Sequence, residues 1–199
     1  MWAAWIAAAL AASAANYALS GRSMLLLLPP WVLSWAQRRE AQGLARESVY
    51  RAAFTAMAAL SLALGYVDWR YAESQRVVAE EIARPFVRQG RRVWYTGHWG
   101  LQHYMDAAGA HPLERDGAEW SAVSRGDIVV IPSVNAWIVA PEKNVLGRQS
   151  NLTIDSGVPL RLMRFDAAQA GFYSSGWGFL PYTISREPIE RFTLFERVR

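Results

Sequence analysis

The chain has 199 residues, of which 52% are hydrophobic and 19% charged, with ten tryptophans and no cysteine. This composition excludes intrinsic disorder, because so aromatic and weakly charged a chain can bury a core, and it excludes a disulfide scaffold. The net charge is +4, and most of the excess lies in residues 1–67, which hold five arginines and two glutamates. Positive charge among apolar segments is typical of a membrane protein rather than of a DNA-binding surface. We therefore expect no nucleic-acid partner.

Three apolar runs in the first third predict transmembrane helices, at about 1–20, 22–37 and 51–67. The first run carries no charge and is long enough to span a bilayer core of about 30 Å. The second run is shorter, but arginines at its ends can extend to the interface, and neighbouring helices can tolerate its double proline. Aromatic residues flank the third run. The alternatives are a signal peptide for the first run and a buried core helix for the second.

The arginines between the runs predict the orientation in the membrane. Arg38, Arg39 and Arg46 lie between the second and third runs, and basic loops stay in the cytoplasm. Everything after Val67 is then outside. We therefore expect a multi-pass protein of the inner or plasma membrane, with transmembrane helices in 1–67 and an extracytoplasmic domain in 68–199.

Residues 68–199 predict a small α/β domain. Apolar positions at helical spacing indicate an amphipathic helix over 71–87, and Gly90 ends it. Residues 93–96 have the pattern of a strand, the glycine-flanked residues 97–100 that of a tight turn, and residues 101–108 that of a helix.

A buried strand is predicted over 128–131, closed by Pro132. The order helix, strand, turn, helix, strand favours a partly parallel sheet with helical cover. We also expect strands at 137–140, 152–154, 160–165 and 191–198. The expected fold class is thus three transmembrane helices followed by a small extracytoplasmic α/β domain.

The sequence offers few groups for chemistry. Of the three histidines, His98 and His103 are five residues apart, which turns them about 140° from each other on a helix. With no cysteine and no close acidic partner, we expect neither a metal site nor a cofactor. The chain has no nucleophile elbow, dinucleotide fingerprint or P-loop, so we assign no catalytic residue.

Three places could contact a ligand. The turn at 97–100 can present backbone N–H groups to an anion, or it can be a structural βα turn with Trp99 packed on the sheet. The aromatic and glycine-rich stretch 171–182, which includes Trp177, can stack on sugars if exposed or form core if buried. Arg22 lies between two predicted spans, where it can pair with a lipid phosphate or simply mark topology.

Two segments carry a resemblance to a known family. Residues 21–30 (GRSMLLLLPP) are similar to the "GRYLLP-x-x-PP" helix of family-39-like membrane glycosyltransferases, such as protein mannosyltransferases and aminoarabinose transferases. Ser23 replaces the usual Tyr and Leu26 the first Pro. Residues 93–105 (VWYTGHWGLQHYM) resemble the "GHWGFQYYM" segment of bacterial members, which precedes a strand beginning "GD", here Gly126 and Asp127.

The resemblance implies a multispanning enzyme, with a helical bundle of the GT-C type, that transfers a sugar from a polyprenyl-phosphate donor to an acceptor outside the cytoplasm. The family's catalytic acid lies in a first external loop that has no counterpart here, so its catalytic and metal residues cannot be carried over. We expect a C-terminal portion, inactive alone, with membrane lipid and the polyprenyl-phosphate sugar as partners. Arg22 is the candidate for the lipid phosphate, and the substrate-binding candidates are His98, Trp99, Gln102 and Trp177. The alternative is a non-enzymatic, membrane-anchored domain that binds glycan, lipid or a protein partner.

Overall fold

The structure is a computed structural model that describes residues 2–15, 28–43, 47–113, 118–136, 138–139, 147–164, 170–174, 177–178 and 180–198. The chain forms two compact units. We call Met1–Val67 with Val158–Arg186 the helical unit, and Asp68–Gly157 with Glu187–Arg199 the sheet unit.

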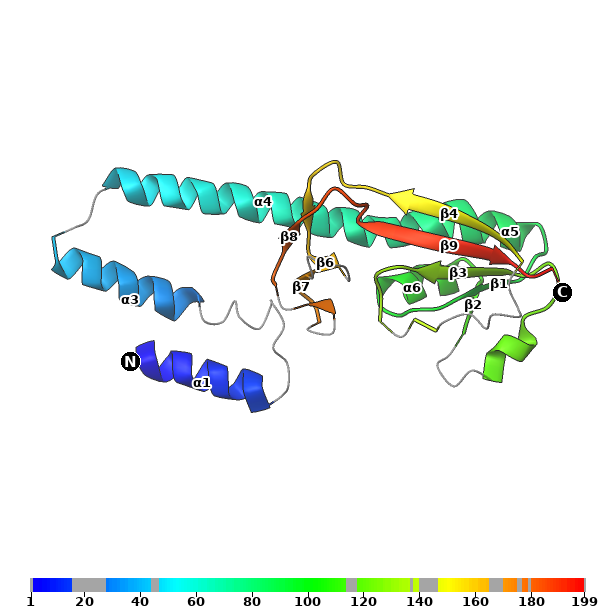
Figure 1. Cartoon of the computed structure of the whole chain (residues 1–199), viewed down its shortest axis with the longest axis horizontal. Coiled ribbons are helices and arrows are strands. Elements are labelled where there is room, and N and C mark those ends of the chain that lie inside the picture. Colours follow the sequence, from blue (N-terminus) through cyan, green and yellow to red (C-terminus); the bar gives the residue numbers. More distant parts are fainter. Residues whose placement is uncertain are drawn as a thin grey trace. The chain divides into compact units, whose positions relative to one another are not determined.

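The helical unit contains α1, α3 and the first part of α4, together with two short strand pairs (Figure 1). In these pairs β5 is antiparallel to β8, and β6 is antiparallel to β7. The bounds are α1 Trp2–Ala15, α3 Leu28–Ala41, α4 Glu47–Val78, β5 Leu160–Arg161, β6 Met163–Arg164, β7 Ala170–Gly171 and β8 Thr183–Ile184.

The prediction of three transmembrane helices is wrong. The described part of α1 is Trp2–Ala15 and that of α3 is Leu28–Ala41. Among the described residues only the continuous helical segment Glu47–Arg88 is long and apolar enough to cross a membrane. The expected fold class is therefore corrected to one candidate span with a mixed sheet.

The described residues of the second predicted span lie in α3, Leu28–Ala41, with Pro29 and Pro30 near its first described residue. Proline is tolerated in the first turn of a helix because the first N–H groups have no intrahelical partner. α3 then continues into Arg38 and Arg39 in its last turn, so it lacks a long apolar stretch.

The sheet unit is built on five strands in the order β2-β1-β3-β9-β4 (Figure 1). β1 runs parallel to β2 and β3, whereas β9 is antiparallel to both β3 and β4. The bounds are η2 Ala79–Ala83, α5 Arg84–Arg88, β1 Val93–Tyr95, α6 Gly100–Ala107, β2 His111–Pro112, η3 Ala118–Ala122, β3 Ile128–Pro132, β4 Arg148–Ile154 and β9 Glu190–Glu196. η2 is a π-helical turn and η3 a 3₁₀ helix.

Several local predictions are confirmed. The helix predicted over 71–87, the strand after it, the helix from 101 and the buried strand from 128 all form, and the sheet is partly parallel. The predicted strand at 152–154 is the end of β4, and that at 191–198 corresponds to β9. The strand expected at 160–165 is instead divided between β5 and β6. Of the strand expected at 137–140, Trp137 and Ala140 lie outside the described residues, and 138–139 are not in a strand.

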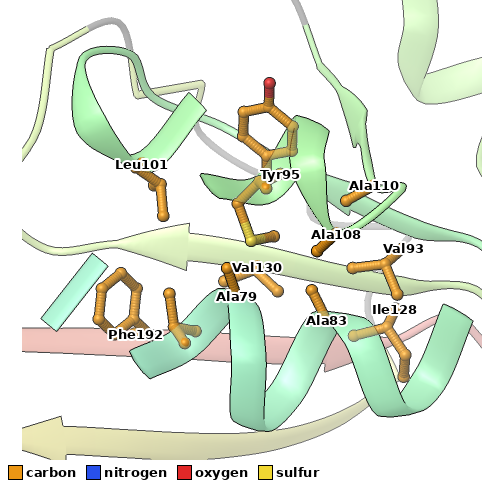
Figure 2. Close-up of a cluster of buried hydrophobic side chains, with 12 residues drawn as sticks. Ala79, Ala83, Val93, Tyr95, Leu101, Ala108, Ala110, Ile128, Val130 and Phe192 are labelled. Carbon is orange, nitrogen blue, oxygen red and sulfur yellow. The ribbon is translucent and has the colours of Figure 1, made fainter. Parts of the chain in front are cut away.

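One face of the sheet carries the larger core (Figure 2). Tyr95 of β1 and Phe192 of β9 are fully buried there against the end of α4, η2 and α6. The Tyr95 hydroxyl donates a hydrogen bond of 2.5 Å to Asp106 on α6. Burial and this bond raise the pKa of Tyr95 far above its usual value. The opposite face packs against η3 through Trp120 and Val123.

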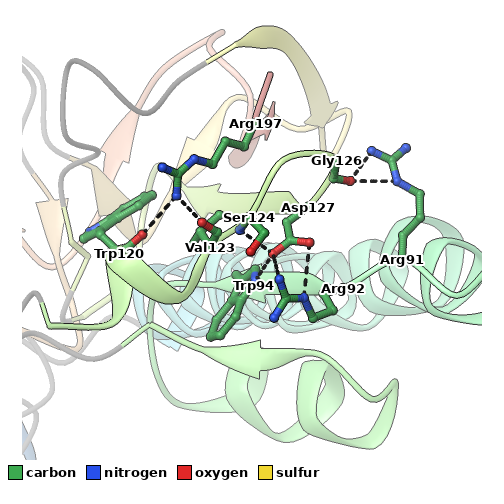
Figure 3. Close-up of polar contacts among 9 residues, drawn as sticks. All are labelled: Arg91, Arg92, Trp94, Trp120, Val123, Ser124, Gly126, Asp127 and Arg197. Carbon is green, nitrogen blue, oxygen red and sulfur yellow. Dashed lines mark hydrogen bonds and ion pairs between the residues drawn. The ribbon is translucent and has the colours of Figure 1, made fainter. Parts of the chain in front are cut away.

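A network of polar side chains lies at the amino end of β3 (Figure 3). Asp127 is 5% exposed and accepts hydrogen bonds from the Trp94 indole (2.9 Å) and from the Ser124 backbone N–H (2.8 Å). Arg92, which is half exposed, forms an ion pair of 3.1 Å with the same carboxylate. Asp127, the acid of the "GD" pair in the resemblance, therefore has a structural role. Its oxygens accept hydrogen bonds from buried donors.

Candidate functional site

The candidate site lies where two neighbouring parallel strands end. Residues 97–100, the Trp99 turn, follow β1, and residues 133–135, the Asn135 loop, follow β3. Because β1 and β3 are parallel neighbours, their carboxyl ends meet at one edge of the sheet. Ligands of α/β proteins commonly bind at this edge.

Two glycines let amide side chains approach the Trp99 turn closely. Gly97 has φ 105, and a Cβ atom added there would lie 3.0 Å from the Asn135 Cγ. A Cβ atom on Gly100 would lie 2.6 Å from the Gln75 Oε1. The glycines of this motif therefore make room for two buried carboxamides, one from the Asn135 loop and one from α4.

Asn135 joins the loop to the turn. Its Oδ1 accepts hydrogen bonds from the backbone N–H groups of His98 and Ala136, each at 2.8 Å. The residue is 2% exposed, and its Nδ2 has no hydrogen-bond partner among the described residues. A buried donor without an acceptor costs about 1–3 kcal/mol, so its retention needs an explanation.

Trp99 has a strained backbone and an accessible ring. With φ 63 and ψ −136, it is the only residue besides glycine with a positive φ in the described part of the chain. Such a conformation costs about 1–3 kcal/mol for a bulky residue and is concentrated at functional sites. The side chain is 46% exposed, so Trp99 is not part of the core.

His98 and Gln102 form a polar pair beside Trp99. The His98 Nδ1 lies 3.0 Å from the Gln102 Oε1, and both side chains are half-buried. Because a carboxamide oxygen can only accept, this contact favours the tautomer with the proton on Nδ1. The pair holds the imidazole in one orientation at the start of α6.

The Asn135 loop is anchored from two sides. The Tyr71 hydroxyl of α4 donates a hydrogen bond of 2.6 Å to the Val134 carbonyl. From β9, the Glu190 Oε1 accepts from Ser133 N (2.8 Å), Ser133 Oγ (2.7 Å), Val134 N (3.1 Å) and Arg191 N (2.9 Å). This carboxyl group is 1% exposed, and its Oε2 has no hydrogen-bond partner in the part of the chain that the structure describes.

Burial raises the pKa of Glu190 to about 7, and the hydrogen bonds to Oε1 only partly offset this. No basic side chain in the described ranges forms an ion pair with it. A buried acid with a raised pKa next to a loop at a strand end is a frequent feature of functional sites. Here its four hydrogen bonds give it the role of holding the loop that carries Asn135.

The structure brings together only some of the predicted residues. His98, Trp99 and Gln102 share the Trp99 turn and the start of α6, whereas Trp177 is a half-buried residue of the helical unit. Arg22 lies outside the described residues. His103 packs on Tyr104 and His111 on Trp94. In the described segments, no group of three or more His, Asp or Glu side chains could hold a metal ion.

Sequence reasoning missed Asn135 and Glu190. Asn135 follows the buried strand β3 directly, which is a place where functional side chains are expected, and this signal could have found it. Glu190 gives no such local signal, because its partners in the Asn135 loop are 56 and 57 residues away in the chain.

The site therefore presents an accessible indole, an oriented imidazole and carboxamide groups. Groups of these kinds can bind and orient a polar ligand. The chain matches no protein-family model, no curated protein and no solved structure.

Proposed function

We propose that this chain is the non-catalytic part of a glycosyltransferase that uses a polyprenyl-phosphate sugar, with the sheet unit contributing a binding site. The observation that carries the proposal is the fold of residues 93–105, on which the resemblance to family-39-like enzymes depends most. This segment forms β1, the Trp99 turn and α6, and the buried amides of Asn135 and Gln75 support its turn. The segment that carries the resemblance therefore includes a turn that is in contact with two buried side chains.

The chemistry of the turn supports binding rather than catalysis. Glycosyl transfer needs a group that takes up the acceptor's proton, commonly a carboxylate, or a metal ion that stabilises charge. Residues 96–102 (TGHWGLQ) contain no acid. The buried Glu190 directs Oε1 to the backbone of the Asn135 loop. The turn itself therefore offers no carboxylate for the reaction.

The first part of α4 supports attachment to a membrane. The helical segment Glu47–Arg88 has a mean hydropathy of 1.3 over its most apolar 18 residues, and only 6% of that window is buried. A core helix of this composition would be mostly buried. Phe54 and Leu62 are each 76% exposed, and lipid is the environment that suits such side chains. We therefore propose that α4 anchors the chain near a lipid-linked donor.

A donor-retention assay tests this function. The full chain in detergent micelles is mixed with a short-chain polyprenyl phosphate carrying radiolabelled mannose, and the protein is separated by gel filtration. We expect the label to elute with the protein and to remain on the lipid, because the chain binds but does not transfer.

Two results would contradict the proposal. If no label elutes with the protein, the chain does not bind this class of donor. If the chain alone moves mannose to a lipid or to water, it is an enzyme and the non-catalytic role is wrong. Polyprenyl phosphate without sugar serves as the competitor that shows how much of the retention depends on the lipid alone.

A further inference from the structure

Arginines gather at the end of the sheet where β1 and β3 begin, which is opposite the end that carries the Trp99 turn. They come from the last turn of α5, from the residues just before β1 and β3, and from the start of β4. We call them the arginine cluster: Arg88, Arg91, Arg92, Arg125 and Arg148. Arg91 is half-buried and the other four residues are exposed.

Contacts of Arg91 connect these segments (Figure 3). Its guanidinium donates two hydrogen bonds, of 3.0 and 2.6 Å, to the carbonyl of Gly126, the residue after Arg125. It also forms an ion pair of 2.6 Å with Glu196. Glu196 of β9 lies directly opposite Arg148 of β4, so both side chains leave the same face of the sheet. One carboxylate therefore faces two arginines, which leaves a surplus of positive charge.

Arg91 and Arg92 are already ordered by contacts within the chain. The Arg91 guanidinium lies 5.0 Å from the centre of the Phe86 ring, and that of Arg92 lies 5.9 Å from the Trp94 ring. Arg92 also pairs with Asp127, yet its side chain remains 48% exposed. A guanidinium has five N–H donors, and one that is held in place loses little side-chain entropy when a second carboxylate binds.

We propose that the arginine cluster is a docking surface for an acidic segment of a partner protein. Charge complementarity selects such a partner, because a guanidinium matches a carboxylate through two parallel hydrogen bonds. Two carboxylates of this chain, those of Asp127 and Glu196, already pair with arginines of the cluster. The proposed function does not use this surface, so the two proposals are independent.

The backbone at this end of the sheet disfavours a phosphate ligand. Phosphate sites commonly add backbone N–H groups from a glycine-rich loop or from a helix N-terminus. Here the N–H groups of Gly126, Asp127 and Ile128 all donate to carbonyl groups of the chain itself. The helix that contributes Arg88 presents its carboxyl end. The cluster therefore offers a ligand side-chain donors, which suit carboxylates.

The length of the helical segment disfavours a lipid surface as the partner. Arg88 is the last residue of the segment Glu47–Arg88, whose most exposed apolar side chains, Phe54 and Leu62, precede residue 68. Residues 68–88 are helical and extend over about 30 Å at 1.5 Å per residue. This exceeds the screening length of about 8 Å at physiological salt. Headgroups near the apolar part of α4 would thus not attract the cluster.

The test is fluorescence anisotropy of a labelled dodecaglutamate peptide, titrated with the full chain in non-ionic micelles at low salt. We expect the parent to bind the peptide, and Arg125→Gln/Arg148→Gln to bind it about fivefold more weakly, as for the loss of two exposed ion pairs. In the described segments neither arginine forms a salt bridge, so glutamine should preserve the fold. Unchanged hydrogen exchange of β3 and β9 checks this.

Arg38→Gln/Arg39→Gln is the matched control. It removes the same charge from α3, in the helical unit, and should bind the peptide like the parent. The proposal is overturned if the parent does not bind, or if both double variants lose the same affinity, because net charge alone would then explain binding.

Inorganic tripolyphosphate distinguishes the other ligand class. Tighter binding of tripolyphosphate than of the peptide, lost in Arg125→Gln/Arg148→Gln, would reveal a phosphate site and refute the polypeptide partner. The same double variant should retain the lipid-linked donor like the parent, so the donor-retention assay tests the proposed function separately.

Discussion

Glu190→Gln is expected to stabilise the sheet unit at pH 8 by about 3 kcal/mol and to leave its stability at pH 4 unchanged. The reason is the burial of the carboxyl group, which raises its pKa from 4.5 to about 7 in the folded chain. Glutamine keeps the oxygen that accepts from Ser133, Val134 and Arg191. It replaces only Oε2, for which the described residues provide no hydrogen-bond donor.

The direction follows from proton binding. Between pH 4.5 and 7 the folded state keeps a proton on Glu190 that the unfolded state has released, so stability falls as the pH rises through this window. Below pH 4.5 both states are protonated, and the group contributes no pH dependence. Glutamine does not ionise, so the variant should lose this part of the pH profile.

The measurement is the free energy of opening of β3 and β9, from amide hydrogen exchange corrected for the intrinsic rate at each pH. Glu187→Gln is the matched control, because its side chain is 59% exposed and the change should leave the profile unaltered. A Glu190→Gln profile that still falls between pH 4.5 and 7 like the parent's would show that another group causes the dependence.

Asp127→Ala is expected to destabilise the sheet unit by about 4 kcal/mol, because it leaves buried donors without an acceptor. The Trp94 indole N–H and the Ser124 N–H both donate to the Asp127 Oδ2. Asp127→Asn should cost only about 1 kcal/mol, since the carboxamide oxygen can still accept and only the ion pair with half-exposed Arg92 is lost.

Arg92→Ala is the control for the ion pair and should cost less than about 1 kcal/mol. All three variants can be compared by hydrogen exchange of β1 and β3. Equal losses for Asp127→Ala and Asp127→Asn would mean that charge, rather than the two buried hydrogen bonds, holds this end of the sheet.

Local patterns predicted the strand–turn–helix segment from 93 and the buried strand from 128. In these segments the hydrophobic periodicity and the glycines agree with what tertiary packing later requires. The prediction of a span from the second apolar run was wrong because α3 carries Arg38 and Arg39 in its last turn, so its apolar stretch is short.

Only some residues of the candidate site could be predicted from the sequence. His98, Trp99 and Gln102 lie within one motif, so a local pattern could suggest them. Asn135 bonds to a backbone N–H 37 residues away, and Glu190 bonds across 57 residues. The motif also has two flanking glycines, and nothing local indicates that Trp99 itself would take the strained positive φ.

Photocrosslinking with a polyprenyl-phosphate mannose that carries a diazirine on its sugar tests most directly whether the sheet unit binds the sugar of a lipid-linked donor. The full chain in micelles is irradiated with this donor, and the labelled peptides are identified by mass spectrometry. The account predicts crosslinks in the Trp99 turn and the Asn135 loop, which polyprenyl-phosphate mannose suppresses by competition. Crosslinks confined to other segments, or no crosslink that the competitor suppresses, would contradict it.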